Sequence, residues 1–177
     1  MAYRGYSGSE GHPHQDGIML DTEAILEFAK SEPRINNQRV FLLGRSLGGA
    51  VATHTQARLA DNGDEWIKGV ILENTFTSIS TMADLIFPFL TKLGPIKTCM
   101  LKLDWNSEKQ ISKITRPIYI VAGAVDQLCP LAMSKTLYES ATNSKGKNIF
   151  IVPNGDHNTT FQAAGEEYFT RLRQFMK

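Results

Sequence analysis

Two hydrophobic patterns meet at one serine in the stretch Arg39-Val40-Phe41-Leu42-Leu43-Gly44-Arg45-Ser46-Leu47-Gly48-Gly49-Ala50-Val51-Ala52. The apolar, partly β-branched run before Gly44 predicts a buried strand. The small residues that follow Ser46 predict a helix. The sequence therefore predicts a strand, a sharp turn and a helix, with Ser46 at the turn.

The remainder of the chain alternates between the same two patterns. We expect further strands over 68–73, 118–122 and 148–152, and helices over 16–30, 50–59, 131–142 and 163–176. Strands that alternate with helices imply right-handed crossovers, so we expect an α/β fold with a mostly parallel sheet flanked by helices. At 177 residues, the chain is expected to form a single domain, over residues 1–177.

One apolar insertion, over residues 75–115, interrupts the alternation between the second and third expected strands. An insertion at the carboxyl end of a strand is where sheets of this class build a lid over a substrate. Ordinary core helices are the alternative, since short apolar runs are ambiguous. If the insertion is a lid, the residues expected to contact substrate are Phe76, Met82, Phe87 and Phe89.

The composition excludes several classes of protein. With 42% hydrophobic residues the chain is able to bury a core, which excludes wholesale disorder. The 19 basic residues are scattered among 18 acidic ones, so binding of nucleic acid through a basic face is not expected. Cys99 and Cys129 form no metal-ligand spacing, so neither a disulfide scaffold nor a structural metal site is expected.

The chain carries no recognisable targeting signal. Its first eight residues are polar and rich in glycine, unlike a signal peptide. The apolar run 85–93 is too short for a membrane span and is interrupted by Pro88 and Lys92. We therefore expect a soluble, cytoplasmic chain, although residues 85–105 could instead lie flat on a membrane surface.

The sequence Gly44-Arg45-Ser46-Leu47-Gly48 matches the GxSxG motif. Between a strand and a helix, this motif holds a nucleophilic serine in a strained turn that exposes its hydroxyl. Glycines are required on either side because a side chain would collide within the turn. The backbone amide of Leu47, at the helix start, is expected to stabilise the oxyanion. An ordinary glycine-serine turn is the alternative.

A serine hydroxyl needs a base to remove its proton, and four histidines compete for that role. His157 follows the last expected strand, at the sheet edge where reacting groups gather. His12 and His14 lie in the opening loop. His54 lies on the helix that follows Ser46. We predict His157 as the base.

The acid that orients this histidine is predicted to be Asp126. It comes directly after the third expected strand and gives the chain order Ser, Asp, His of an α/β-hydrolase. Glu73 and Asp156 are the alternatives, because Glu73 ends the second strand and Asp156 precedes His157. The three groups predict acyl transfer through an acyl-serine, a reaction that requires no metal and no cofactor.

Several motifs add a resemblance over essentially the whole chain: Tyr3-Arg4-Gly5-Tyr6-Ser7-Gly8-Ser9-Glu10-Gly11, Asp16-Gly17, the GxSxG motif, Glu73-Asn74-Thr75-Phe76 and Gly155-Asp156-His157-Asn158. Together they resemble the eukaryotic α/β-hydrolase domain-containing protein thirteen subgroup. The depalmitoylating hydrolases of the seventeen subgroup are more distantly similar. The resemblance implies the triad Ser46, Asp126 and His157, and by relationship an acyl ester or thioester substrate. The apolar insertion favours a hydrophobic acyl group, carried either by a protein, as in depalmitoylation, or by a lipid.

In the family that the chain resembles, the Tyr-Arg-Gly-Tyr motif lies in the middle of the fold, after several strands and a His-Gly segment that supplies a second oxyanion amide. We therefore expect an amino-terminally truncated hydrolase that lacks the first strands and the membrane anchor of full-length relatives. The strand over 40–43 would then have an unpaired edge. A binding module that is inactive or partner-dependent, pairing through this edge, is the alternative function. A peptidase ranks last, since no pocket for a peptide terminus is evident.

Overall fold

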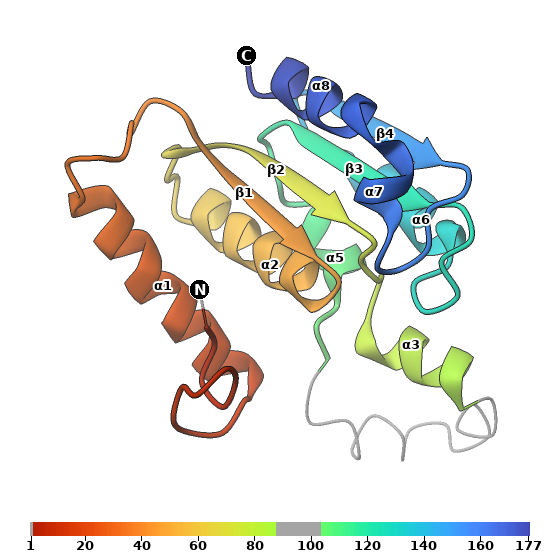
Figure 1. Ribbon diagram of the computed structural model, residues 1–177. Helices are drawn as coiled ribbons and strands as arrows, with labels where there is room; N and C mark the ends of the chain where they lie inside the picture. Colours follow the sequence, from red (N-terminus) through yellow and green to blue (C-terminus); the bar gives the residue numbers. More distant parts are fainter. Residues whose placement is uncertain (1, 88–103) are drawn as a thin grey trace.

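The computed structural model describes residues 2–87 and 104–177 (Figure 1). Within these residues a parallel sheet has the order β1-β2-β3-β4, formed by Val40–Arg45, Ile67–Glu73, Ile118–Gly123 and Lys147–Val152. The helices are α1 Gln15–Ser31, α2 Leu47–Asp61, α3 Ile79–Ile86, α5 Ser107–Ile111, α6 Leu131–Ser140, α7 Thr160–Ala164 and α8 Glu166–Phe175. None of these helices is long and apolar enough to cross a membrane. The expected α/β fold is confirmed.

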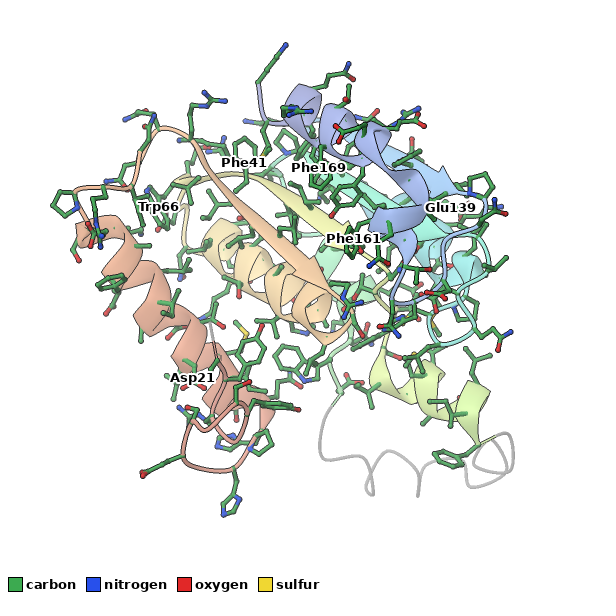
Figure 2. All side chains as sticks on the ribbon, viewed as in Figure 1. Asp21, Phe41, Trp66, Glu139, Phe161 and Phe169 are labelled. Carbon is green, nitrogen blue, oxygen red and sulfur yellow. The ribbon has the colours of Figure 1, made fainter. Side chains whose placement is uncertain are left out.

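Helices cover both faces of the sheet. On one face, Leu72 and Ile120 belong to a core cluster that includes residues of α2, α5 and α6. On the other face, Tyr168 of α8 packs against the strands, and its ring is flanked by Phe161 and Phe169 (Figure 2). Burial on both faces explains why β2 and β3 are almost continuously apolar in sequence. The expectation of a buried first strand is wrong, because β1 lies at the edge of the described sheet and only Gly44 of this strand is buried.

Two expected boundaries are wrong for identifiable reasons. The sequence predicts a first strand that stops before Gly44, but β1 continues to Arg45 because both residues pair with the end of β2. The expected helix over 163–176 is two helices, α7 and α8. Gly165 separates them with a φ of 56°, a left-handed conformation that interrupts helical hydrogen bonding.

The described parts of the insertion over 75–115, residues 75–87 and 104–115, lie in different environments. Trp105, Ile111 and Ile114 are almost completely buried in the core, as the alternative of ordinary core structure predicts for this part. In contrast, α3 contains no buried residue. A lid role for the insertion stays a prediction.

The turn glycine Gly44 gives a test of the fold. A Cβ atom at this position would collide with the backbone carbonyl of Gly48 in α2. Since neither backbone segment is free to move, we expect Gly44→Ala to lower the free energy of unfolding by about 3 kcal/mol or more, measured by urea denaturation. Gly146→Ala is the control, because a Cβ there meets no atom within 4 Å and should change stability by less than about 0.5 kcal/mol. Equal stability of the two variants would contradict the close approach of Gly44 to α2.

Candidate active site

Ser46 lies in a strained turn between β1 and α2. Its φ of 53° and ψ of −122° are rare for a residue with a side chain. Two hydrogen bonds from the end of β2 stabilise this conformation. The amide of Ser46 donates to the carbonyl oxygen of Glu73 at 3.0 Å, and the Thr75 hydroxyl donates to the carbonyl oxygen of Ser46 at 2.7 Å. Both hydrogen bonds fix the backbone that carries the serine hydroxyl.

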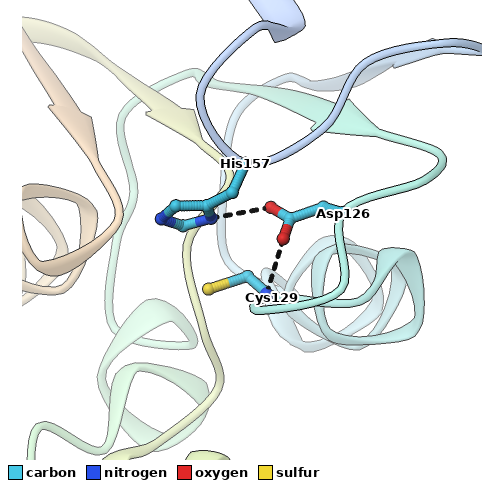
Figure 3. Close-up of side chains that lie close together, drawn as sticks. All are labelled: Asp126, Cys129 and His157. Carbon is cyan, nitrogen blue, oxygen red and sulfur yellow. Dashed lines mark hydrogen bonds and ion pairs between the residues drawn. The ribbon is translucent and has the colours of Figure 1, made fainter.

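A chain of side-chain hydrogen bonds connects Ser46, His157 and Asp126. His157 Nε2 lies 3.1 Å from Ser46 Oγ. On the other side of the ring, His157 Nδ1 lies 2.9 Å from Asp126 Oδ2 (Figure 3). The other oxygen, Oδ1, accepts the amides of Leu128 and Cys129, each at 2.8 Å. The carboxylate side chain is completely buried, while the imidazole is 16% exposed. The network assigns the proton to Nδ1, which leaves Nε2 able to accept the serine proton.

The structure therefore brings together the three side chains that the sequence predicts, and it places the two alternative acids elsewhere. Glu73 accepts the Tyr168 hydroxyl at 2.6 Å, and burial together with this bond raises the pKa of Tyr168. Asp156 accepts the amides of Asn158 and Thr159. Contacts with the Thr159 hydroxyl and these amides lower the pKa of the Asp156 carboxyl. Neither carboxylate hydrogen-bonds to the imidazole in the residues that the structure describes.

The other histidines have local structural contacts. The His54 ring packs edge-on against Trp105, with 5.0 Å between ring centres, and burial lowers its pKa. His14 caps the first helix, because its Nδ1 accepts the amide of Gly17 at 3.0 Å. His12 is exposed in the opening loop. None of these rings hydrogen-bonds to Ser46 within the described part of the chain.

The residues predicted to contact substrate lie in different environments. Phe76 is 3% exposed and packs within a core cluster. Met82 of α3 is partly buried, and its sulfur lies 3.8 Å from Cys129 Sγ. Phe87, just after α3, is 50% exposed. Phe89 lies outside the described residues. Substrate contact by these four residues stays a prediction.

Asn74 is a buried residue at the site to which the sequence pattern gives no role. It is 1% exposed, has a φ of 45°, and hydrogen-bonds to the loop that carries His157. The sequence feature that could have drawn attention to Asn74 is its position as a polar residue directly after the apolar run of β2. Its bonding partners are about 50 to 90 positions away in sequence, so no local pattern identifies them.

Among the described residues, Asp126, Cys129 and His157 form a cluster whose potential metal-ligand atoms lie within 4.8 Å of one another (Figure 3). A metal ion bound to all three would have to break the hydrogen bond between Asp126 and His157. Burial and the neighbouring Asp126 charge raise the pKa of the Cys129 thiol to about 12. The thiol is therefore protonated at neutral pH, and Ser46 is the better candidate nucleophile.

No protein-family model matches the chain. It is similar to the α/β-hydrolase domain-containing protein WAV2 of Arabidopsis thaliana, with 34% identity over 100% of this chain and 59% of that protein. Protein bem46 of Schizosaccharomyces pombe is 32% identical over 99% of this chain and 56% of its own length. An uncharacterized membrane protein of Saccharomyces cerevisiae, YNL320W, is 34% identical over 99% of this chain and 58% of its own length. The chain thus spans somewhat less than three fifths of these curated relatives.

Solved structures share the fold at low sequence identity. The Pyrococcus furiosus esterase PF2001 matches with a TM-score of 0.75 and 18% identity, over 98% of this chain and 66% of that chain. The structure of Est1E from Butyrivibrio proteoclasticus with ferulic acid bound matches with a TM-score of 0.70 and 17% identity, over 99% of this chain and 76% of that chain. The described sheet and helices therefore form the α/β-hydrolase fold over a partial length. The sequence similarity is to WAV2, which is named as an α/β-hydrolase domain-containing protein, and to bem46.

The environment of Cys129 predicts low reactivity. Because the thiol is 2% exposed and its pKa is about 12, we expect iodoacetamide to alkylate Cys129 at least about 100-fold more slowly in the native chain than in urea. Mass spectrometry of a Cys99→Ser variant measures this rate without interference from the second cysteine. Fast alkylation under native conditions would contradict the buried placement.

His54 predicts a pH dependence of stability. Its pKa is lowered in the folded chain, so the unfolded chain binds the proton more strongly, and stability should fall as pH drops below the ordinary value of 6.5. His54→Phe keeps a ring against Trp105 but cannot titrate, so the fall should be smaller in this variant. Urea midpoints measured across this pH range test the difference. His12→Gln, in the exposed loop, should behave as wild type, and an unchanged slope in His54→Phe would contradict the prediction.

Proposed function

We propose that the chain carries the catalytic groups of a serine hydrolase that cleaves a carboxylic ester or thioester through an acyl-serine. The hydrogen-bonded chain from Ser46 Oγ through the His157 imidazole to Asp126 supports this proposal most directly. The strained backbone of Ser46 supports it further, because strain of this kind concentrates at functional sites.

In the proposed reaction, His157 Nε2 takes the proton of Ser46 Oγ as that oxygen attacks the carbonyl carbon. The other ring proton stays on Nδ1 and is donated in the hydrogen bond to Asp126, whose negative charge stabilises the imidazolium. Nε2 then protonates the leaving alcohol or thiol, which leaves the acyl group on Ser46. The same imidazole then removes a proton from water as the water oxygen attacks the acyl carbon. Nε2 returns that proton to Ser46 Oγ as the bond from Oγ to the acyl carbon breaks and the acid leaves.

The oxyanion of each tetrahedral intermediate needs hydrogen-bond donors. Leu47 is the first residue of α2, so no carbonyl of the helix accepts its amide. The positive end of the helix dipole lies at the same place. Leu47 is therefore the proposed oxyanion donor that the turn itself supplies.

A hydrophobic acyl group is the substrate feature that the surroundings favour. Val125 and Leu128 flank Asp126 and are 54% and 39% exposed. On α3, Leu85 and Ile86 are each 50% exposed. The contact between Met82 of α3 and Cys129 places this helix beside the loop that carries Asp126. These side chains support an ester or thioester with a hydrophobic acyl group. The more distant resemblance to the depalmitoylating hydrolases of the seventeen subgroup makes protein depalmitoylation the specific example.

A partner-dependent binding module is the second candidate, and the sheet edge favours it. Within the described residues, β1 pairs with β2 on one side only, and Leu43 of β1 is 55% exposed. An apolar, unpaired edge is a template for pairing with another strand. In this candidate, the edge binds another chain and Ser46 forms no acyl intermediate.

Fluorophosphonate labelling distinguishes the two candidates. We expect a fluorescent fluorophosphonate to label the purified chain, Ser46→Ala to abolish labelling, and His157→Ala to reduce it strongly. Asp126→Asn should slow labelling on the order of 10,000-fold, because the imidazole loses the partner that sets its tautomer. In-gel fluorescence over time gives the rates.

Asp156→Asn is the matched control, since this carboxylate neighbours His157 in sequence but does not bond to its ring. It should be labelled at the wild-type rate. A folded wild-type chain that is not labelled, or labelling that survives in Ser46→Ala, would overturn the proposed hydrolase and favour the binding module.

A further inference from the structure

The motif Glu73-Asn74-Thr75-Phe76 lies at the carboxyl end of β2, and its second residue has an unusual conformation and environment. Asn74 is 1% exposed and has a φ of 45°, in the left-handed region. Its amide donates to the carbonyl oxygen of Val121 at 3.0 Å, which extends the pairing of β2 with β3. The backbone of Asn74 is therefore anchored to the centre of the sheet.

The side-chain amide of Asn74 joins two segments that are distant in sequence. Its Nδ2 atom donates to the carbonyl oxygens of Asp156 at 2.9 Å and His157 at 3.2 Å, and to Thr160 Oγ1 at 2.8 Å. Its Oδ1 atom accepts the amide of Gly123 at 2.8 Å. One carboxamide thus connects the end of β3 to the loop that follows β4.

These two segments carry the acid and the base. Asp126 follows Gly123 by three residues, and His157 is itself one of the residues whose carbonyl Asn74 binds. The 2.9 Å bond between Asp126 and His157 depends on the separation of their two loops, which Asn74 spans. Buried hydrogen bonds of this kind are strong and specific because no water competes for them.

The next residue holds the third member of the site. Thr75 Oγ1 donates to the carbonyl oxygen of Ser46, so consecutive residues at the end of β2 bind the backbones of both Ser46 and His157. Arg45 also reaches the His157 carbonyl, at 3.1 Å, but from an exposed position. Asn74 is the buried contact.

We propose that Asn74 is a positioning residue, whose carboxamide sets the backbone of His157 so that the imidazole reaches Ser46 and Asp126 together. It touches no reacting atom and acts only through His157. This inference rests on the proposed hydrolase function, and it predicts that the loss of the amide donors lowers turnover without weakening substrate binding.

Asn74→Asp isolates the donors. Aspartate tolerates a positive φ as asparagine does, and it keeps an oxygen for the Gly123 amide. It lacks the NH₂ group and places a carboxylate oxygen against two carbonyl oxygens. Asn148→Asp, at an exposed position on β4, is the control for the same change in charge. Asn74→Gly also accepts the backbone conformation and serves if the aspartate variant does not fold.

Two measurements test the role. With an acyl ester substrate, we expect kcat to fall about 10- to 100-fold in both Asn74 variants, with KM within about twofold of wild type, because small displacements of a catalytic group cost this much. Asn148→Asp should match wild type. In the proton NMR spectrum, the downfield resonance of the His157 Nδ1 proton is assigned by its absence from His157→Ala. This resonance should weaken or shift in the Asn74 variants and stay unchanged in Asn148→Asp.

Wild-type kcat and an unchanged imidazole resonance in folded Asn74 variants would overturn the proposal. An equal fall of kcat in Asn148→Asp would overturn it as well. The resonance does not depend on turnover. If the wild-type chain hydrolyses no ester, the hydrolase function fails separately, and the resonance still decides whether Asn74 positions His157.

Discussion

The parallel pairing of β2 with the strands on both sides is the constraint on which the site depends. In this register Glu73 lies opposite Arg45 of β1 and Val121 of β3, so β1 and β2 end at the same level and β3 continues two residues further, to Gly123. The turn that carries Ser46 and the loop that carries Asp126 consequently start side by side. β4 pairs with β3 up to Val152 and brings the His157 loop to the same edge. A shift in this register would separate the three side chains even if each loop kept its own conformation.

Strain at Ser46 is tolerated because the surrounding bonds are buried and numerous. The positive φ of the serine would relax in an isolated turn, but its amide and carbonyl both bond to the end of β2. Asn74 also has a positive φ, and it bonds to two other segments of the chain, the end of β3 and the loop after β4. The two strained residues thus lie on neighbouring strand ends and stabilise the same edge. The sheet supplies the rigidity that holds the proposed nucleophile and its proposed base at a fixed separation.

The sequence predicts the strands and the grouping of Ser46, Asp126 and His157 because these depend on short-range patterns: apolar runs, a motif between a strand and a helix, and polar residues at strand ends. It does not predict the role of Asn74, the break at Gly165 or the burial of Trp105. The role of Asn74 and the burial of Trp105 depend on tertiary contacts, whereas the break depends on a left-handed conformation that glycine permits but does not require. Trp105 lies within an insertion that is apolar throughout, so composition alone does not separate its core part from its exposed part.

The exposed edge of β1 and the hydrogen-bonded site around Ser46 depend on different contacts. Every contact described between Ser46 and its partners comes from β2, α2 or the loops after β3 and β4, on the inner side of β1. A strand added at the outer edge would satisfy free backbone groups and cover Leu43. It would not need to move β2, which sets the positions of the proposed catalytic groups. Pairing at that edge therefore bears on solubility and assembly, whereas the proposed reactivity of Ser46 depends on the contacts around the end of β2.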